Sequence, residues 1–278
     1  MSSEDQEGTR SGQAREAGPE ERSEREPVSY TRHRRSALVT INRPFCRNAI
    51  DGHTATELER AVRRFESDPS AQVLIITGAG TEAFCAGADL KRIDSFASRV
   101  NAPAGPLGFT RLTTAKPTIA AISGWCVAGG LEIALWCDLR IAASGSKLGF
   151  TERRFGVPLI DGGTQRLPRI VGLGRALELI LTGRVIDAQE ALAIGLVNEI
   201  VSEGAHLERA FELAEQIASF PQQTMLADRT AAISGLDMPL PAGLELESRS
   251  GPALLDQARA GAARFAAGAG RSGRPLHE

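Results

Sequence analysis

Apolar runs of strand length alternate with longer amphipathic stretches through the first two-thirds of this sequence. The apolar runs are bounded by turn residues and predict strands at Ala37–Asn42, Val73–Thr77, Thr118–Ile122 and Leu139–Ala142. Helical patterns alternate with them at Thr54–Glu66, Gly129–Trp136, Arg175–Thr182 and Ala188–Ile194. This alternation restricts the chain to an α/β core, because strands and helices that follow one another pack as layers.

The last part of the sequence is helical. Helical stretches occur at Leu207–Ser219, Pro221–Ser234 and Ala253–Ala267, and the Gly- and Arg-rich end at Gly268–Glu278 is expected to fray. With 278 residues, 42% of them hydrophobic, the chain can bury a full core. We predict an α/β core at residues 29–205 and a helical C-terminal region at residues 206–278.

The first 28 residues contain almost nothing apolar. Eight acids against four arginines give this segment a net charge of −4, so the remainder carries +2 within the total of −2. We therefore predict a disordered charged tail at residues 1–28. The tail lacks the apolar region of a secretory signal and is too acidic for a mitochondrial transit peptide, so it is expected to remain as an uncleaved extension.

Four cysteines, Cys46, Cys85, Cys126 and Cys137, lie far apart without a CxxC pair. Three of them sit in apolar segments, and buried free thiols are typical of a reducing compartment, so we expect a cytoplasmic protein. The four histidines are scattered, and no metal site is expected. No run of about 18 apolar residues is present, so no membrane span is expected.

The segment Gly78–Ala83 follows a predicted strand and matches the dinucleotide-binding pattern GxGxxA. A dinucleotide-binding unit would open a helix here, and its second strand would end in an acid about 20 residues later. Instead Phe84–Asp89 continues as a glycine-containing loop, and the region around Asn101–Pro103 is no strand. We therefore expect no nicotinamide cofactor.

Two irregular segments of small residues allow backbone amides to approach a ligand closely. One is Ala86–Ala88, and the other runs from a predicted strand into a helix that begins near Gly129 and Gly130. Two amides aimed at one oxygen form an oxyanion hole, which stabilises the enolate of a thioester, and losing one donor costs about 100–1000-fold. The alternative is that both segments are tight strand-to-helix turns.

Two glutamates lie near these segments. Glu132 falls in the first turn of an apolar helix. If it is buried, the cost of burying a carboxyl indicates a function. If it is exposed, it would only interact favourably with the helix dipole. Glu152 follows twenty residues later, before Arg153 and Arg154, with which it can alternatively form an ion pair. A pair of acids is what the addition of water to a conjugated double bond requires.

Several motifs, in order from about Ser36 to the last helix, resemble the enoyl-CoA hydratase/isomerase (crotonase) family. They are Ile41–Pro44 with Asn48–Ile50, Phe84–Leu90, Gly124–Glu132, Trp136–Ala142 and Gly162–Pro168. The resemblance implies a spiral of β-β-α units whose helical C-terminal region mediates homotrimers, often paired into hexamers. It implies enoyl-CoA hydratase activity on an acyl-CoA thioester, with no cofactor beyond the substrate's own coenzyme A.

The resemblance also implies roles for individual residues. It assigns the oxyanion amides to Ala88 and Gly129 and the two catalytic acids to Glu132 and Glu152. Contacts with the acyl-CoA substrate are implied for Arg47, Ala86, Asp89, Leu90, Lys91, Gly130, Thr151 and Asp161.

The sequence departs from the family pattern at three places. Ala128 stands where many hydratases have glycine, Phe150–Glu152 replaces the usual Gln-Pro-Glu, and Asp161 adds an acid to the following loop. For Asp161 two interpretations stay open. It caps the helix that begins near Thr164, or it points inward beside Glu152, raises the pKa of that acid and relays protons.

Three alternatives to hydration follow from the sequence. An enoyl-CoA or dienoyl-CoA isomerase is the rival within the family. The basic run at 32–35 suggests RNA binding, but it is short and without interleaved aromatics, so a solvated strand edge and no nucleic-acid partner are expected. A non-catalytic acyl-CoA-binding protein is the third, and the two acids argue against it.

Overall fold

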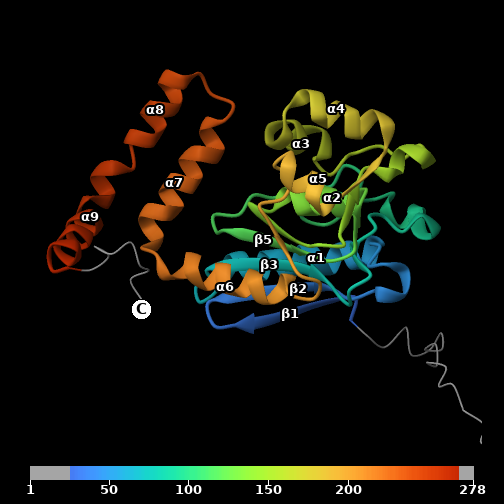
Figure 1. The fold of residues 1–278 in the computed structure, drawn as a ribbon, viewed down its shortest axis with the longest axis horizontal. Helices are drawn as coiled ribbons and strands as arrows, with labels where there is room; N and C mark the ends of the chain where they lie inside the picture. The colour runs from blue at the N-terminus through green and yellow to red at the C-terminus, as the bar shows by residue number, and fades with distance from the viewer. Residues whose placement is uncertain (1–25, 269–278) are drawn as a thin grey trace, which may run out of the picture.

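The computed structural model describes residues 26–268, and Figure 1 shows two packed sheets with three C-terminal helices that project from them. The larger sheet has, in spatial order, β1 (Val28–His33), β2 (Ser36–Ile41), β3 (Val73–Gly78), β5 (Thr118–Ile122), β7 (Leu139–Ala143) and β10 (Glu199–Val201). The smaller sheet has β4 (Ala83–Cys85), β6 (Trp125–Val127), β8 (Lys147–Gly149) and β9 (Val185–Asp187). Only the β1–β2 and β8–β9 pairs in these two sheets are antiparallel.

Successive strands alternate between the two sheets. β3, β5 and β7 lie in the larger sheet, and the strand that follows each of them, β4, β6 or β8, lies in the smaller one. Each pair therefore makes one β-β unit that turns from one sheet to the next. This is the spiral of β-β-α units that the family resemblance implied.

Nine α-helices are present in residues 26–268: α1 (Gly52–Ser67), α2 (Gly129–Trp136), α3 (Gly163–Val171), α4 (Leu173–Thr182), α5 (Ala188–Ala193), α6 (His206–Ser219), α7 (Gln222–Gly235), α8 (Leu240–Ser248) and α9 (Gly251–Ala266). Short 3-10 helices occur at η1 (Pro44–Cys46), η2 (Leu90–Phe96) and η3 (Thr151–Phe155). None of the nine is long and apolar enough to cross a membrane.

The larger sheet buries both of its faces. On one face, Val73, Ile75 and Ile119 pack with Ala210 and Ala214 of α6. The alanines recur every four residues, so one stripe of small side chains lets α6 lie close to the sheet. On the other face, the main core includes α1 and α2, and α2 is enclosed on all sides because every residue from its start to Leu135 is buried.

The strands and helices that we predicted are all present, with ends that differ by two residues at most. The sequence analysis missed β1, β4, β6, β8, β9, β10 and α8. Most of these strands have three residues, too few to show an alternating pattern. After Gly78 the chain enters strand β4 and not a helix, which argues against a dinucleotide-binding turn.

The predicted ends of the chain fall largely outside the described residues. Of the tail at 1–28, only the last three residues are described, and Val28 already pairs with Ile41 as the first residue of β1. The tail prediction was therefore wrong at its end, because a buried Val28 belongs to the sheet. The frayed end predicted at Gly268–Glu278 lies outside the described part except for Gly268.

Two ion pairs of the described chain join the C-terminal helices to the core, and one of them links Asp237, just after α7, to Arg169 of α3 at 2.9 Å. Arg229 of α7 donates to both carboxylate oxygens of Asp138, at 2.9 and 3.0 Å, and Asp138 also accepts from the Thr118 amide of β5 at 2.8 Å. Beyond this junction α7, α8 and α9 extend away from the sheets (Figure 1). Exposed apolar side chains on and between them include Ile233, Leu236, Met238, Leu240, Leu244, Leu255 and Phe265.

Candidate active site

A cavity of about 410 Å³ lies between α2, η2, η3 and the loop at 157–161. We call it the Glu132 cavity. Eight of the residues proposed from the sequence line it: Ala86, Ala88, Leu90, Gly129, Glu132, Thr151, Glu152 and Asp161. The spiral of strands thus brings together side chains and amides from four separate segments.

The first oxyanion amide proposed from the sequence, that of Ala88, lies in a loop fixed on both sides. The Ile50 amide donates to the Gly87 carbonyl at 2.8 Å, and the Asp89 amide donates to the Ile50 carbonyl at 2.7 Å. These two hydrogen bonds to Ile50 use the Gly87 carbonyl and the Asp89 amide, on either side of Ala88. Within residues 26–268, the Ala88 amide itself has no acceptor, so it remains available to a ligand.

The second proposed amide, that of Gly129, is the first of α2. It has no protein acceptor among the described residues, and the positive end of the helix dipole adds to its attraction for an anion. Gly87 makes the approach of the two segments possible, because a Cβ added there would lie 2.7 Å from the Gly129 nitrogen. Ala128 has φ of +51°, an unfavourable value for a residue with a side chain, and it turns the chain into α2.

Glu132 is buried with only 3% of its surface exposed. Its Oε1 atom accepts hydrogen bonds from the amides of Asp161 at 3.0 Å and Gly163 at 2.8 Å. Burial raises the pKa of Glu132 to about 8; the two amides act against this rise, and the neighbouring acids Asp161 and Glu152 contribute to it. The carboxyl therefore exchanges a proton near neutral pH, as an acid–base catalyst must.

Glu152 is buried in η3 with 6% of its surface exposed. Neither carboxyl oxygen has a hydrogen-bond partner among the described residues, and burial raises the pKa of this group. The proposed ion pair with Arg153 or Arg154 does not form. A buried carboxyl without a protein partner costs stability, so its position beside Glu132 in one cavity points to chemistry.

Asp161 lines the Glu132 cavity, but it neither caps α3 nor raises the pKa of Glu152. Helix α3 begins after Gly162 without a side-chain cap, and the Asp161 carboxylate instead accepts from the Leu107 amide at 3.0 Å and from the Thr110 hydroxyl. Its negative charge raises the pKa of Glu132 and does not act on Glu152. Asp161 therefore fixes the loop whose amides hold Glu132.

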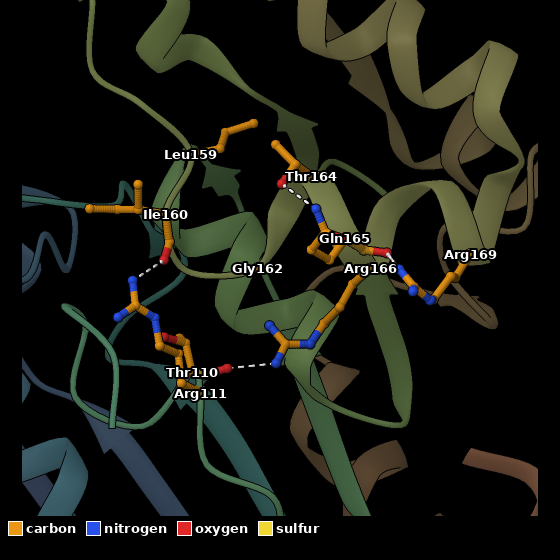
Figure 2. Close-up of a pocket in the computed structure, with 9 residues that line it drawn as sticks. All are labelled: Thr110, Arg111, Leu159, Ile160, Gly162, Thr164, Gln165, Arg166 and Arg169. Atoms are coloured by element: carbon orange, nitrogen blue, oxygen red, sulfur yellow. Dashed lines mark hydrogen bonds between the residues drawn. The ribbon is translucent and has the colours of Figure 1, made fainter. Parts of the chain in front are cut away.

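Arg166 supports the same loop from a second pocket of about 520 Å³ that shares Ile160 with the Glu132 cavity. Its guanidinium donates to the Asp161 carbonyl at 2.9 Å. Figure 2 shows that Arg166 also donates to the Thr110 carbonyl, at 2.5 Å, and that Arg111 donates to the Ile160 carbonyl, at 3.0 Å. In residues 26–268, no group of three or more His, Cys, Asp or Glu side chains could hold a metal ion.

Four residues proposed as substrate contacts do not line the Glu132 cavity. Arg47 pairs with Glu82 at 2.7 Å on the surface, and its carbonyl accepts from the Ala86 amide at 3.0 Å. Asp89 pairs with the buried Arg43 at 3.2 Å, and its side chain also accepts from the Lys91 amide. The Lys91 side chain is exposed, and Gly130 is packed so closely that an added Cβ would lie 2.0 Å from the Cys85 carbonyl oxygen.

The sequence analysis missed the apolar wall of the Glu132 cavity. It comprises Ile93, Phe96, Ala97, Val100, Pro106, Leu107, Ala128, Phe155, Val157, Pro158 and Ile160, with Asp94 beside it. A signal was present, because Ile93, Ala97 and Val100 follow the spacing of one helical face in a segment without strand character.

The comparisons with known proteins agree with this geometry. The profile of the enoyl-CoA hydratase/isomerase family matches residues 32–267. The chain belongs to that family. The resemblance drawn from its motifs is confirmed, and so is the crotonase-like α/β fold.

Relatives of this family member include hydratases. The (E)-benzylidenesuccinyl-CoA hydratase of Thauera aromatica is 39% identical over 222 residues, covering 78% of this chain and 86% of that protein. The crotonyl-CoA hydratase of Syntrophomonas wolfei is 38% identical over 227 residues, covering 80% and 87%. The crystal structure of enoyl-CoA hydratase EchA1 from Mycobacterium marinum has a TM-score of 0.82 at 35% identity, covering 90% of this chain and 98% of that one.

The raised pKa of Glu132 predicts how stability depends on pH. The folded protein keeps this proton up to about pH 8, whereas the ordinary value is 4.5, so ionisation costs stability as pH rises through that range. Glu132→Gln keeps an oxygen for the two amides and removes the cost. Thermal unfolding measured across pH should show that the free energy of unfolding of the variant rises relative to that of the wild type from about pH 4.5 to 8. The difference should reach on the order of a few kcal/mol. A gain that is the same at all pH values would contradict this.

The position of Asp161 predicts a shift in the pH–rate profile. Asp161→Asn keeps an oxygen for Leu107 and Thr110 but removes the negative charge that raises the pKa of Glu132. The limb of the kcat/KM profile that reports Glu132 should therefore move to lower pH. Asp161→Ala is the control, since it loses the loop bonds and should lower the melting temperature. An unshifted limb for Asp161→Asn would show that its charge does not reach Glu132.

Proposed function

We propose that this protein is an enoyl-CoA hydratase that adds water in the syn sense across the double bond of a 2-enoyl-CoA thioester. Water gives a hydroxyl to Cβ, and a proton is delivered to Cα. As the new C–O bond forms, the electron pair of the double bond moves onto the thioester carbonyl oxygen as an enolate. The family assignment and the hydratase names of its relatives support this activity.

The observation that carries the proposal is the meeting of two acids and two free amides at one cavity. The Ala88 and Gly129 amides lie in segments that touch at Gly87, where they can donate to one enolate oxygen. Glu132 and Glu152 line the same cavity. In its ionised form one carboxyl takes a proton from water, and in its protonated form the other delivers a proton to Cα.

The coenzyme A contacts are part of the proposal. Ala86, Leu90 and Thr151 line the Glu132 cavity and are suited to the thioester end of the substrate. The backbone near Arg47 and the exposed Lys91 are suited to the nucleotide and phosphates, outside the cavity. The reaction as written needs no further cofactor, because all its atoms come from water and the thioester.

Removing either acid tests the mechanism. Glu132→Gln and Glu152→Gln should each lower kcat for hydration by about 100-fold or more, because each loses a proton-transfer group. Folding should survive both, as circular dichroism would verify. If Glu152→Gln kept near-wild-type turnover while Glu132→Gln did not, the two-acid mechanism would be wrong, and a single-acid isomerase that shifts the double bond would move ahead.

We further propose that the protein forms homotrimers, or hexamers made of two trimers, through its C-terminal helices. The exposed apolar side chains along α7, α8 and α9 support this, because a monomer would leave them in water. The buried free thiols Cys85, Cys126 and Cys137 support a reducing, cytoplasmic location.

Light scattering tests the assembly. The wild type should have a mass of three or six chains, and Leu240→Glu with Leu244→Glu should shift it toward the monomer, since both side chains are more than half exposed in the single chain. His53→Glu with Ser67→Glu, at exposed positions of α1 and outside the C-terminal helices, is the control for added negative charge. A monomeric wild type would contradict the proposal.

A further inference from the structure

Apolar side chains form much of the lining of the Glu132 cavity. Ile93, Ala97 and Val100 come from η2 and the turn that follows it, and Phe155 and Val157 come from η3 and the loop after it. Of the described residues that line the cavity, none is Lys, Arg or His, while four are acids: Asp94, Glu132, Glu152 and Asp161. An acyl chain that enters this cavity therefore meets apolar side chains and acids but no cationic side chain of residues 26–268.

The cations on the outer wall are bound elsewhere. Arg92 and Arg99 flank Ile93 and Val100 in sequence, yet neither lines the cavity. Arg92 pairs with Asp51 at 3.5 Å, and Arg99 pairs with Glu59 at 3.0 Å. Each of the two therefore already has a carboxylate partner on the protein.

The cations near the acids do not line the cavity either. Arg43 pairs with Asp51 at 3.1 Å and is buried, and Arg166 is bound to main-chain carbonyls. Arg153 follows Glu152, and its charge opposes the rise that burial causes in the pKa of that acid, but it does not line the cavity. No described guanidinium therefore lies on the cavity wall, where it could pair directly with a second carboxylate.

We propose that the Glu132 cavity selects acyl-CoA thioesters whose acyl group ends in hydrocarbon and rejects those that carry a second carboxylate. A second carboxylate would be buried without a counter-ion and among acids that offer it no compensating charge, which is a costly arrangement in a protein. Hydrocarbon on Ile93, Val100 and Phe155 instead gains from burial. This inference rests on the proposed function, because it specifies the substrate class of the same site.

Binding of saturated acyl-CoA thioesters tests the selection without needing turnover. Three ligands of equal chain length are compared by calorimetry on the full-length protein: the straight-chain hexanoyl thioester, its ω-carboxylate and the methyl ester of that ω-carboxylate. The ω-carboxylate should bind about 100-fold more weakly than the hexanoyl thioester. The methyl ester, which has the size but not the charge, should recover most of the difference.

A variant at the outer wall tests whether charge is the cause. Ile93 is 46% exposed, so a longer polar side chain is compatible with folding there. Ile93→Lys supplies a cation and should narrow the discrimination against the ω-carboxylate by about tenfold. Ile93→Met, which is unbranched and neutral, is the matched control and should leave the discrimination unchanged.

The outcomes separate this inference from the proposed function. Equal binding of the hexanoyl thioester and the ω-carboxylate would overturn the inference. So would a weakly bound methyl ester, or an Ile93→Met variant that narrows the gap as much as Ile93→Lys. If the binding differences appear as expected but no 2-enoyl-CoA is hydrated, the selection stands and the proposed hydration fails.

Discussion

The close approach of two backbone segments at Gly87 and Gly129 is the constraint on which the site depends. A single methyl group at Gly87 would come within 2.7 Å of the Gly129 nitrogen, so the contact tolerates no side chain there. One segment leaves the smaller sheet through β4, and the other leaves it through β6 into α2. Because β4 and β6 are neighbours, the sheet delivers both free amides to the same edge.

The hydrogen bonds that hold the Glu132 carboxyl in position also adjust its pKa. The loop at 161–163 donates two amides to Glu132, and the Asp161 carboxylate is itself bound at Leu107 and Thr110. The amides favour the charged form of Glu132, whereas burial and the neighbouring acids favour the neutral form. Opposing effects of this kind allow a buried carboxyl to work in both protonation states.

The sequence predicted the long elements and the motif residues but not the wall of the cavity. Helix α2 was predicted with its correct ends, because glycines mark its start and apolar residues fill it. The strands β4, β6 and β8 were missed, since three residues show no alternation. Ile93, Val100 and Phe155 belong to short irregular turns whose partners lie far away in sequence, so local pattern could not assign them to the cavity. The cap interpretation of Asp161 failed for the same reason, because its partners are Leu107 and Thr110.

The carboxylate of Asp138 joins β5 to α7 through the Thr118 amide and both nitrogens that Arg229 presents to it. A two-point ion pair of this kind fixes direction as well as distance, because the guanidinium and the carboxylate share one plane. The direction in which α7 leaves the sheets is therefore already fixed within a single chain. We call α7, α8 and α9 together the C-terminal arm. A partner that packs against α7, α8 and α9 meets a pre-organised arm, and less of the free energy of association is lost to ordering it.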